Sequence, residues 1–253
     1  MYKDRRIVYT ENGSSIVDSG RRTLAAIPCF NEGKTIGSVI LKALEQVDEV
    51  VVIDDGCTDD TVRVAEHAGA VVLRHGGNKG YGAAVQSAFS YARDHGFDVM
   101  TILDGDGQHD ADEIQTVMRP VIDEKVDISI GSRFLDETST RVPRYRRFGI
   151  WVLTRLSNAG SKNHKVTDGQ SGFRAYSRRA IEMLNPKDAD MGVSAEILMQ
   201  GRKQNLLYKE VPITVDYTGD CSTKRPVGHG LGVIVSILKY MEVEHALLFF
   251  GVP

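Results

Sequence analysis

Short apolar runs alternate with stretches in which apolar residues recur at helical spacing. The apolar runs cover residues 23–30, 49–54, 70–75, 99–103 and 127–131. Strands of a parallel sheet have such continuous runs because helices bury both of their faces. Between the runs, the stripes at 36–47, 81–92 and 114–122 predict amphipathic helices. The pattern therefore predicts an α/β fold, Rossmann-like, with a mostly parallel sheet flanked by helices.

The second half of the chain is less regular. We expect a helix near 193–204 and a strand near 207–217 within the same domain. An apolar stripe that begins at Leu231 predicts a C-terminal amphipathic helix, which suits packing on the domain or lying in a membrane interface. The predicted organisation is a polar N-terminal extension (1–22), one domain (23–225) and this C-terminal helix (226–253).

Composition narrows the class of protein. The chain has 253 residues, 42% hydrophobic and 26% charged, which is the composition of an ordinary globular α/β domain. With a net charge of −3, the protein lacks the positive electrostatic field that nucleic-acid binding needs, so we expect no nucleic acid partner. The three cysteines form no C-x-x-C pair, and no uncharged apolar run reaches the ~18 residues that span a bilayer. We expect a cytoplasmic protein.

The sequence Asp104-Gly105-Asp106 directly follows an apolar run. In an extended backbone residues i and i+2 point the same way, so both carboxylates are expected to converge on one cation. Carboxylate oxygens suit Mg²⁺ or Mn²⁺, which complete their coordination with substrate phosphates. The alternative is an acidic turn with no ligand, since this short motif is common. A calcium loop is less suited, because Gln115 stands where that loop needs glutamate.

Polar residues follow three of the predicted strands, at 28–32, 54–60 and 104–110. In open α/β sheets ligands bind beyond the carboxyl ends of the strands. One such end is easily explained as a helix cap, but three together predict a site.

A glycine-rich loop at 76–84 precedes a predicted helix. It is not a dinucleotide-binding fingerprint, because that motif follows the first strand of its unit and this loop follows a later strand. Its helix N-terminus, together with Lys79, can still hold a phosphate or a base edge of a nucleotide.

Five motifs occur in a distinctive order: P-x-x-N-E (28–32), V-I-D-D-G (52–56), D-x-D-x-Q (104–108), G-S-R (131–133) and D-x-x-S-G-F-R (168–174). Over residues 23–224 the chain resembles the inverting family-2 glycosyltransferases of GT-A fold. Within them it resembles the polyprenyl-phosphate sugar synthases, typified by dolichol-phosphate mannosyl- and glucosyltransferases.

The resemblance implies a role for each matching residue. It assigns binding of the donor's base and ribose to residues at the first two strand ends. It assigns binding of the metal and the diphosphate to the D-x-D-x-Q motif. It assigns binding of the acceptor phosphate to Arg133 and to an arginine of the 144–147 cluster. The candidate residues are Pro28, Asn31, Glu32, Asp54, Asp55, Lys79, Gly80 and Asp104 for the donor, Asp104, Asp106 and Gln108 for the metal, Arg133, Arg146, Arg147 and Lys224 for the acceptor phosphate, and Asp106 and Asp168 for catalysis.

The basic segment 133–165 carries eight Lys and Arg residues against two acidic ones. A solvated basic face is the usual explanation of such a segment. Aromatic residues such as Tyr145 and Trp151 lie among these charges, and this combination also suits a lipid phosphate at an anionic bilayer surface. We favour the second explanation.

The predicted function is transfer of a hexose (glucose, N-acetylglucosamine or mannose) from a nucleotide diphosphate sugar to dolichyl or polyprenyl phosphate at the cytosolic membrane face, with Mg²⁺ or Mn²⁺. Some mannosyl-transferring relatives have a lysine where this chain has 192–194, including Ser194, so a UDP-sugar is favoured over GDP-mannose. The alternatives are a carbohydrate hydroxyl as acceptor, or a nucleotide-sugar-binding module without turnover. Because a phosphate acceptor is already largely dianionic, Asp168 is assigned to sugar positioning or to the role of base.

Overall fold

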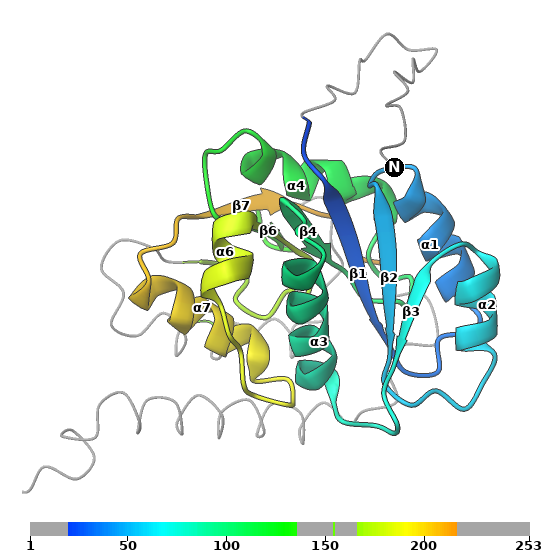
Figure 1. The fold of residues 1–253 in the computed structure, drawn as a ribbon. Helices are drawn as coiled ribbons and strands as arrows, with labels where there is room; N and C mark the ends of the chain where they lie inside the picture. The colour runs from blue at the N-terminus through cyan, green and yellow to red at the C-terminus, as the bar shows by residue number, and fades with distance from the viewer. Residues whose placement is uncertain (1–19, 136–153, 155–165, 217–253) are drawn as a thin grey trace, which may run out of the picture.

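The structure is a computed structural model that describes residues 20–135, 154 and 166–216. Its strands are β1 (Thr23–Cys29), β2 (Glu49–Asp54), β3 (Val71–Arg74), β4 (Val99–Ile102), β5 (Ile128–Ser132), β6 (Arg174–Ser177) and β7 (Tyr208–Pro212). The helices are α1 (Ile36–Leu44), α2 (Thr61–His67), α3 (Tyr81–Asp94), α4 (Ile114–Ile122), α6 (Arg178–Met183) and α7 (Val193–Lys203), with a short 3₁₀ helix η1 (Ala111–Glu113) before α4. The predicted α/β class is confirmed (Figure 1).

The strands form one sheet in the order β3-β2-β1-β4-β6-β5-β7. Neighbouring strands pair in parallel, except that β6 runs antiparallel to both β4 and β5. The chain passes from β1 outward to β3 and then returns to place β4 on the other side of β1. This reversal of strand order makes the crevice at the carboxyl ends of β1 and β4 the expected ligand site.

Each face of the sheet carries its own apolar core. On one face α3, α6 and α7 pack around Leu24, Ala26 and Met100. On the other, α1, α2 and α4 pack around Ala25, Ile27 and neighbouring strand residues (Figure 1). Successive residues of β1 therefore enter opposite cores, because side chains alternate across a strand. Burial on both faces explains why the sequence of β1 reads as a continuous apolar run.

Two elements were not expected from the sequence, and one strand is shorter than predicted. The strand β6 and the helix α6 lie in a segment with no clear period. The strand predicted over 207–217 ends at Pro212, and Val215 then makes an isolated bridge to His109. The predicted C-terminal helix and the N-terminal extension lie outside the described residues, so the domain boundaries stay predictions.

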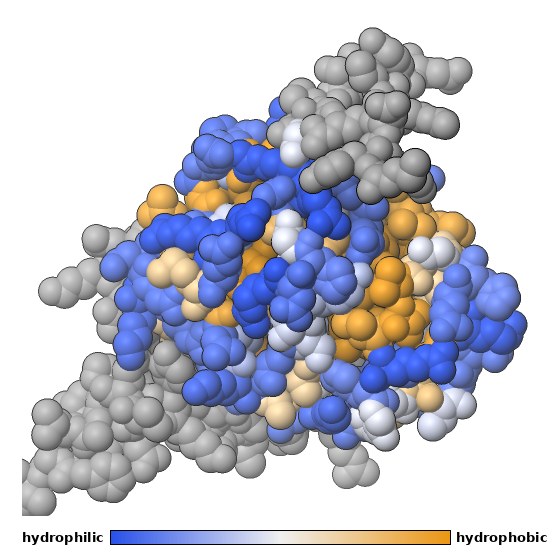
Figure 2. All heavy atoms as spheres, in the orientation of Figure 1, coloured by the Kyte–Doolittle hydropathy of each residue, from blue (hydrophilic) through white to orange (hydrophobic). Residues whose placement is uncertain are grey.

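The surface on the α3 side is mainly hydrophilic, with an apolar area over β2 and β3 (Figure 2). In β3, Val71 is an exposed hydrophobic residue, with 40% of its surface accessible. Within residues 20–135 and 166–216, the structure has no helix long and apolar enough to cross a membrane.

Candidate active site

The acidic motif lies at the crevice between β1 and β4. Asp104 follows β4, and Gly105 crosses in front of the end of β1. A Cβ on Gly105 would lie 2.6 Å from the Sγ of Cys29, so only glycine lets the chain pass this closely. The carbonyl of Gly105 also accepts a hydrogen bond from Thr35 Oγ1 at 2.8 Å. The motif is therefore fixed against β1, on the side that carries Glu32.

The pKa values of three carboxyl groups in this crevice are raised, mainly by burial. Burial, followed by the charges of Asp106 and Asp104, raises the pKa of Glu32 from its ordinary 4.5 to about 7. Burial also raises the pKa of both aspartates, and the charge of Asp104 adds to the shift at Asp106. A cluster of carboxylates that repel one another in this way favours a bound cation, which relieves the repulsion.

The path of the chain between the two aspartates differs from the extended one expected. Residues 105 and 106 form a turn, in which Asp106 Oδ1 accepts a hydrogen bond from the backbone N–H of Gln108 at 2.9 Å. Gly107 has a φ of 75°, which closes the turn. The two aspartates are thus brought together by a turn and not by strand alternation.

The predicted metal would be held by the carboxylates of Asp104 and Asp106. Across the described ranges, no three His, Cys, Asp or Glu side chains are grouped closely enough to hold a metal ion. Mg²⁺, however, is usually bound through one or two carboxylates and completes its coordination with waters and substrate phosphates. The pair Asp104 and Asp106 fits that mode, with the third carboxyl of Glu32 adding negative charge.

His109 lies next to Asp104. Its side chain is 7% exposed, its ring packs against Phe173 at 5.3 Å, and its Nδ1 lies 3.7 Å from Asp104 Oδ2. Burial, together with the charge of Arg133, lowers the pKa of His109 to about 4, so the ring is neutral at physiological pH. His109 Nδ1 has no hydrogen-bond partner among the described residues.

Asp104 is also bounded by the segment before β6. A Cβ on Gly172 would lie 3.0 Å from the hydroxyl of Tyr81 and 3.3 Å from both carboxylate oxygens of Asp104. Tyr81 hydrogen-bonds to Asp104. Behind this segment Arg174 is 1% exposed and donates to the carbonyls of Ser171, Gly169 and Ser194 at 2.8, 2.8 and 3.0 Å. The S-G-F-R motif thus forms a packed wall next to the acidic pair.

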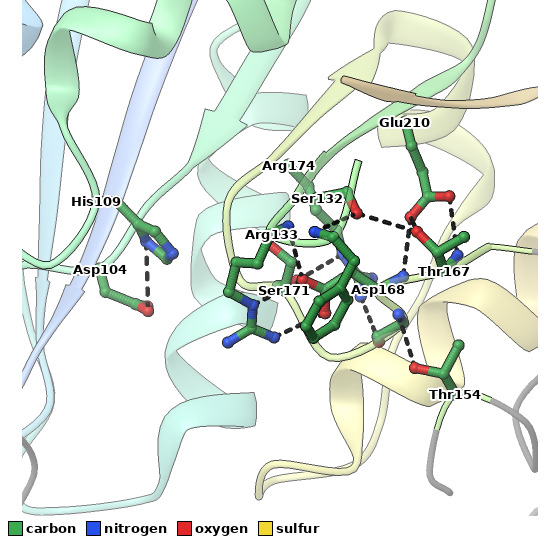
Figure 3. A network of polar contacts seen from close by, with 12 residues as sticks. Asp104, His109, Ser132, Arg133, Thr154, Thr167, Asp168, Ser171, Arg174 and Glu210 are labelled. Atoms are coloured by element: carbon green, nitrogen blue, oxygen red, sulfur yellow. Dashed lines mark hydrogen bonds and ion pairs between the residues drawn. The ribbon is translucent and has the colours of Figure 1, made fainter. Parts of the chain in front are cut away.

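Arg133 and Asp168 form a buried bidentate ion pair on the far side of the crevice. Nε and Nη2 of Arg133 each lie 2.7 Å from a carboxylate oxygen of Asp168, and the Arg133 N–H donates to the same carboxylate at 3.1 Å (Figure 3). The Asp168 side chain is fully buried, whereas that of Arg133 is 14% exposed. Both oxygens of Asp168 therefore accept bonds from Arg133, so this carboxylate orients the guanidinium.

A second layer of polar residues holds Asp168 in place. Glu210 of β7 accepts hydrogen bonds from the backbone N–H groups of Asp168 and Thr167 at 2.9 and 2.8 Å, and from the Thr167 hydroxyl at 2.9 Å. Thr154 Oγ1 accepts from the N–H of Gly169 at 3.1 Å (Figure 3). Sequence reasoning missed these residues. The one available signal was Glu210, an acidic residue within a predicted strand.

The residues predicted to bind the donor base and ribose lie at the ends of β1 and β2, with Pro28 inside β1. Asn31 Oδ1 accepts from the N–H of Thr58 at 2.8 Å, which ties the two ends together. Asp54 Oδ1 accepts from the N–H groups of Gly56 and Cys57 at 3.1 and 2.7 Å. In the structure these carboxylate and amide groups shape the loops, and their contact with a nucleotide stays a prediction.

Residues 188–190 pack against the N-terminus of α3. The N–H of Ala83 donates to the carbonyl of Ala189 at 3.2 Å, and a Cβ on Gly82 would lie 2.0 Å from the carbonyl of Asp188. The N–H of Gly80 donates to Asp55 at 2.9 Å. One N–H of this helix end is therefore already paired, and binding of a phosphate or a base edge by the rest of this end stays a prediction. Donor binding by Lys79 and Gly80 likewise stays a prediction.

Arg146, Arg147 and Lys224 lie outside the described residues, as does most of the basic segment. Of the predicted acceptor residues the structure describes Arg133. It brings Arg133 to the carboxyl end of β5, at the same edge of the sheet as Asp104.

The comparisons with known proteins agree with this architecture. Residues 25–184 match the model of the family described as glycosyl transferase family 2. The chain belongs to this family. The predicted GT-A fold and the predicted glycosyltransferase activity are thereby confirmed. The match covers the strands that carry both the acidic motif and Arg133.

Several relatives and solved structures are similar to the chain. An uncharacterized protein of Methanocaldococcus jannaschii is 36% identical over 76% of this chain and 80% of its own. The UDP-N-acetylglucosamine–dolichyl-phosphate N-acetylglucosaminyltransferase of Methanococcus voltae is 27% identical over 76% of this chain and 84% of its own. Glucosyl-3-phosphoglycerate synthase of Mycobacterium tuberculosis, crystallised with Mn²⁺ and UDP-glucose, has a TM-score of 0.71 at 20% identity, covering 93% of this chain and 84% of that one. This last likeness is one of fold.

Proposed function

We propose that the protein transfers a hexose from a nucleotide diphosphate sugar to the phosphate of a dolichol or another polyprenol. The observation that carries this proposal is the placement of an acidic pair, Asp104 and Asp106, at the same edge of the sheet as the fixed guanidinium of Arg133, whose charge acts on Asp104. The charge of Arg133 acts on both Asp104 and His109, so the two sides of the crevice are electrostatically coupled. One side suits a cation and a diphosphate, and the other suits an acceptor phosphate.

The donor side depends on a divalent cation in this proposal. Asp104 and Asp106 would hold Mg²⁺ or Mn²⁺, with Gln108 as a further predicted ligand. When bound, the cation neutralises charge that develops on the leaving nucleoside diphosphate. His109 is neutral, so it places no positive charge next to Asp104 that would compete with the cation.

The acceptor side provides a guanidinium with a fixed direction. Asp168 holds Arg133 through two bonds, and Glu210 holds the backbone of Asp168, so little ordering remains when a phosphate arrives. An oxygen of the acceptor phosphate attacks the anomeric carbon in line with the leaving diphosphate. The new carbon–oxygen bond forms as the bond to the diphosphate oxygen breaks. The acceptor is already largely dianionic, so Asp168 serves as a positioning residue.

The sugar nucleotide is proposed to be a UDP-sugar. The Methanococcus voltae relative acts on UDP-N-acetylglucosamine by name, whereas a Micrococcus luteus relative, 28% identical over 76% of this chain, is an undecaprenyl-phosphate mannosyltransferase. Ser194 stands where some mannosyl-transferring relatives have lysine, and it is 7% exposed, with its carbonyl bonded to Arg174. This segment therefore serves packing here, which favours the UDP-sugar.

The proposed location is peripheral, at the cytosolic membrane face where a lipid phosphate is presented. Names of the relatives that include dolichyl or undecaprenyl phosphate support it. We expect the purified chain to co-sediment with anionic liposomes, and we expect added salt to weaken this binding. A chain that stays in the supernatant at low salt contradicts the proposed location and leaves the transfer reaction untouched.

The proposed reaction is tested with purified protein, Mn²⁺ and a short-chain polyprenyl phosphate. UDP-glucose, UDP-N-acetylglucosamine and GDP-mannose are supplied separately, and the product is measured by mass spectrometry. We expect a hexosyl phosphate lipid with the phosphorylated acceptor and none with the unphosphorylated polyprenol. Transfer to the free polyprenol or to a glycan would support a hydroxyl acceptor instead. Nucleotide binding without turnover on any acceptor would indicate a binding module.

A further inference from the structure

Ser87, His75 and Asp55 form a hydrogen-bonded relay beside the acidic site. Ser87 Oγ lies 2.9 Å from His75 Nε2, and His75 Nδ1 lies 2.8 Å from Asp55 Oδ1. Ser87 lies in the middle of α3, whereas His75 directly follows β3 and Asp55 directly follows β2. The side chains of His75 and Asp55 are 9% and 6% exposed. The relay thus connects α3 to two strand ends of the sheet.

Asp55 is the point at which two loops meet. Besides His75, its carboxylate accepts hydrogen bonds from the backbone N–H groups of Lys79 and Gly80 at 2.8 and 2.9 Å. The loop after β2 also touches the glycine-rich loop, because a Cβ on Gly56 would lie 2.7 Å from the backbone N of Asn78. The loops at 54–57 and 75–80 therefore behave as one unit, with Asp55 at its centre.

The chemistry of the three groups sets the direction of the relay. An ionised carboxylate only accepts hydrogen bonds, so His75 donates to Asp55 from Nδ1. In the tautomer with its proton on Nδ1, the ring accepts a bond at Nε2 from the Ser87 hydroxyl. The bond to Asp55 thereby fixes the tautomer of the ring, and the bond to Ser87 at the other nitrogen holds its rotation.

The same three residue types occur in hydrolytic triads, but this arrangement is not one. Ser87 lies within α3, where the neighbouring backbone N–H groups bond within the helix. They are therefore not available to stabilise an oxyanion beside Ser87 Oγ, as a hydrolytic serine requires. The relay accordingly has a positioning role.

We infer that Ser87 and His75 are positioning residues for the nucleotide of the donor, because they hold Asp55 and the two loops that it joins. The inference rests on the proposed function and on the expectation from the sequence that the loop ends after β1 and β2 receive the base and ribose of its donor. A groove of about 670 Å³, lined in part by His75, Ser87 and Tyr91, borders the relay. Water from this groove can replace a lost Ser87 hydroxyl but does not fix the ring, so the loops become less well ordered.

The test is a calorimetric titration of the Ser87→Ala variant with UDP and Mn²⁺, or with GDP where the parent chain binds that nucleotide. We expect the nucleotide Kd to rise 3- to 10-fold, with kcat and the KM for polyprenyl phosphate within twofold of the parent. Ser87→Thr keeps the hydroxyl and is expected to restore the Kd to within twofold. Alanine is the best helix former, so the variant is expected to fold.

Ser90→Ala is the matched control, because Ser90 lies one turn along α3 and lines the same groove. Its hydroxyl has a contact to Arg93 at 3.5 Å and takes no part in the relay. We expect its nucleotide Kd to equal that of the parent. Equal Kd values for Ser87→Ala and the parent overturn the inference and leave the proposed function intact. Failure of the parent itself to bind UDP or GDP with Mn²⁺ overturns the proposed function, and this inference with it.

Discussion

Asp168 fixes the guanidinium of Arg133 through two bonds of 2.7 Å, although the two residues are 35 positions apart in the chain. The Asp168 carboxylate is fully buried, so the pair resists screening by salt. Arg133 is thereby aimed before any acceptor is present.

Asp168→Asn is expected to raise the KM for polyprenyl phosphate at least tenfold, because the amide cannot hold Arg133 through two charged bonds. It also leaves Arg133 without its buried partner, which is expected to cost about 3 kcal/mol of the free energy of unfolding. Steady-state kinetics and urea denaturation measure the two effects. An unchanged acceptor KM in a folded variant would remove Asp168 and Arg133 from the acceptor site.

Arg178→Ala provides the comparison for an exposed ion pair. Arg178 contacts Glu182 and Asp98 at 3.0 and 3.4 Å, but its side chain is 57% exposed. We expect a much smaller loss in the free energy of unfolding than for Asp168→Asn, and no change in KM. A loss as large as that of Asp168→Asn would show that burial does not distinguish these pairs.

Gly172→Ala is expected to weaken Mn²⁺ binding about tenfold, because the added methyl group would lie 3.3 Å from both carboxylate oxygens of Asp104 and 3.0 Å from the Tyr81 hydroxyl. Displacement of Asp104 changes the geometry that the cation needs. Gly76→Ala is the control, since a Cβ on Gly76 meets nothing within 4 Å. Metal titration followed by Mn²⁺ paramagnetic resonance measures both variants, and equal affinities would place Gly172 outside the metal site.

Glu32→Gln is expected to stabilise the metal-free protein at pH 8. The folded-state pKa of Glu32 is about 7, above its ordinary 4.5, so folding favours the protonated form. Stability contributed by this group is complete below pH 4.5 and is lost as the pH rises through 7. The variant should gain about 1 kcal/mol at pH 8, less than the full shift implies because the carboxyl is partly solvated.

Urea denaturation in EDTA at pH 8 and pH 4.5 tests this difference. We expect the parent and Glu32→Gln to have similar stability at pH 4.5, where Glu32 is protonated in the folded protein. The same gain at both pH values would contradict the electrostatic origin of the effect. A loss of stability at pH 8 would show that the ionised carboxylate is favourable in the crevice.

The sequence predicted the parallel part of the sheet because its strands are buried on both faces and read as apolar runs. It missed β6, which begins with Arg174 and runs antiparallel between two parallel strands. That arginine is buried because three carbonyl groups surround it, and nothing local in the sequence indicates them. In an element this short, with one buried charge, the apolar residues show no regular spacing from which a strand could be predicted.

The position of Asp104 at a strand end was predictable because polar residues follow an apolar run there, whereas Arg133 became a candidate through the family resemblance. The site was not predictable where the function of a residue depends on a distant partner. Glu210 supports Asp168 from 42 positions away, and Tyr81 meets Asp104 only because α3 packs against the sheet. The packing of residues 188–190 against the N-terminus of α3 was not predictable for the same reason.

The most direct test of the account is metal-dependent nucleotide binding by Asp106→Asn, measured calorimetrically with UDP in the presence and absence of Mn²⁺. The amide keeps the shape of the side chain and removes the charge that faces the cation. We predict that Mn²⁺ strengthens binding to the parent and to the exposed-residue control Asp110→Asn, but not to Asp106→Asn, which also loses transfer to polyprenyl phosphate while staying folded. Mn²⁺-dependent binding by Asp106→Asn, with a tenth or more of the parental transfer rate, would contradict the assignment of the metal to this motif.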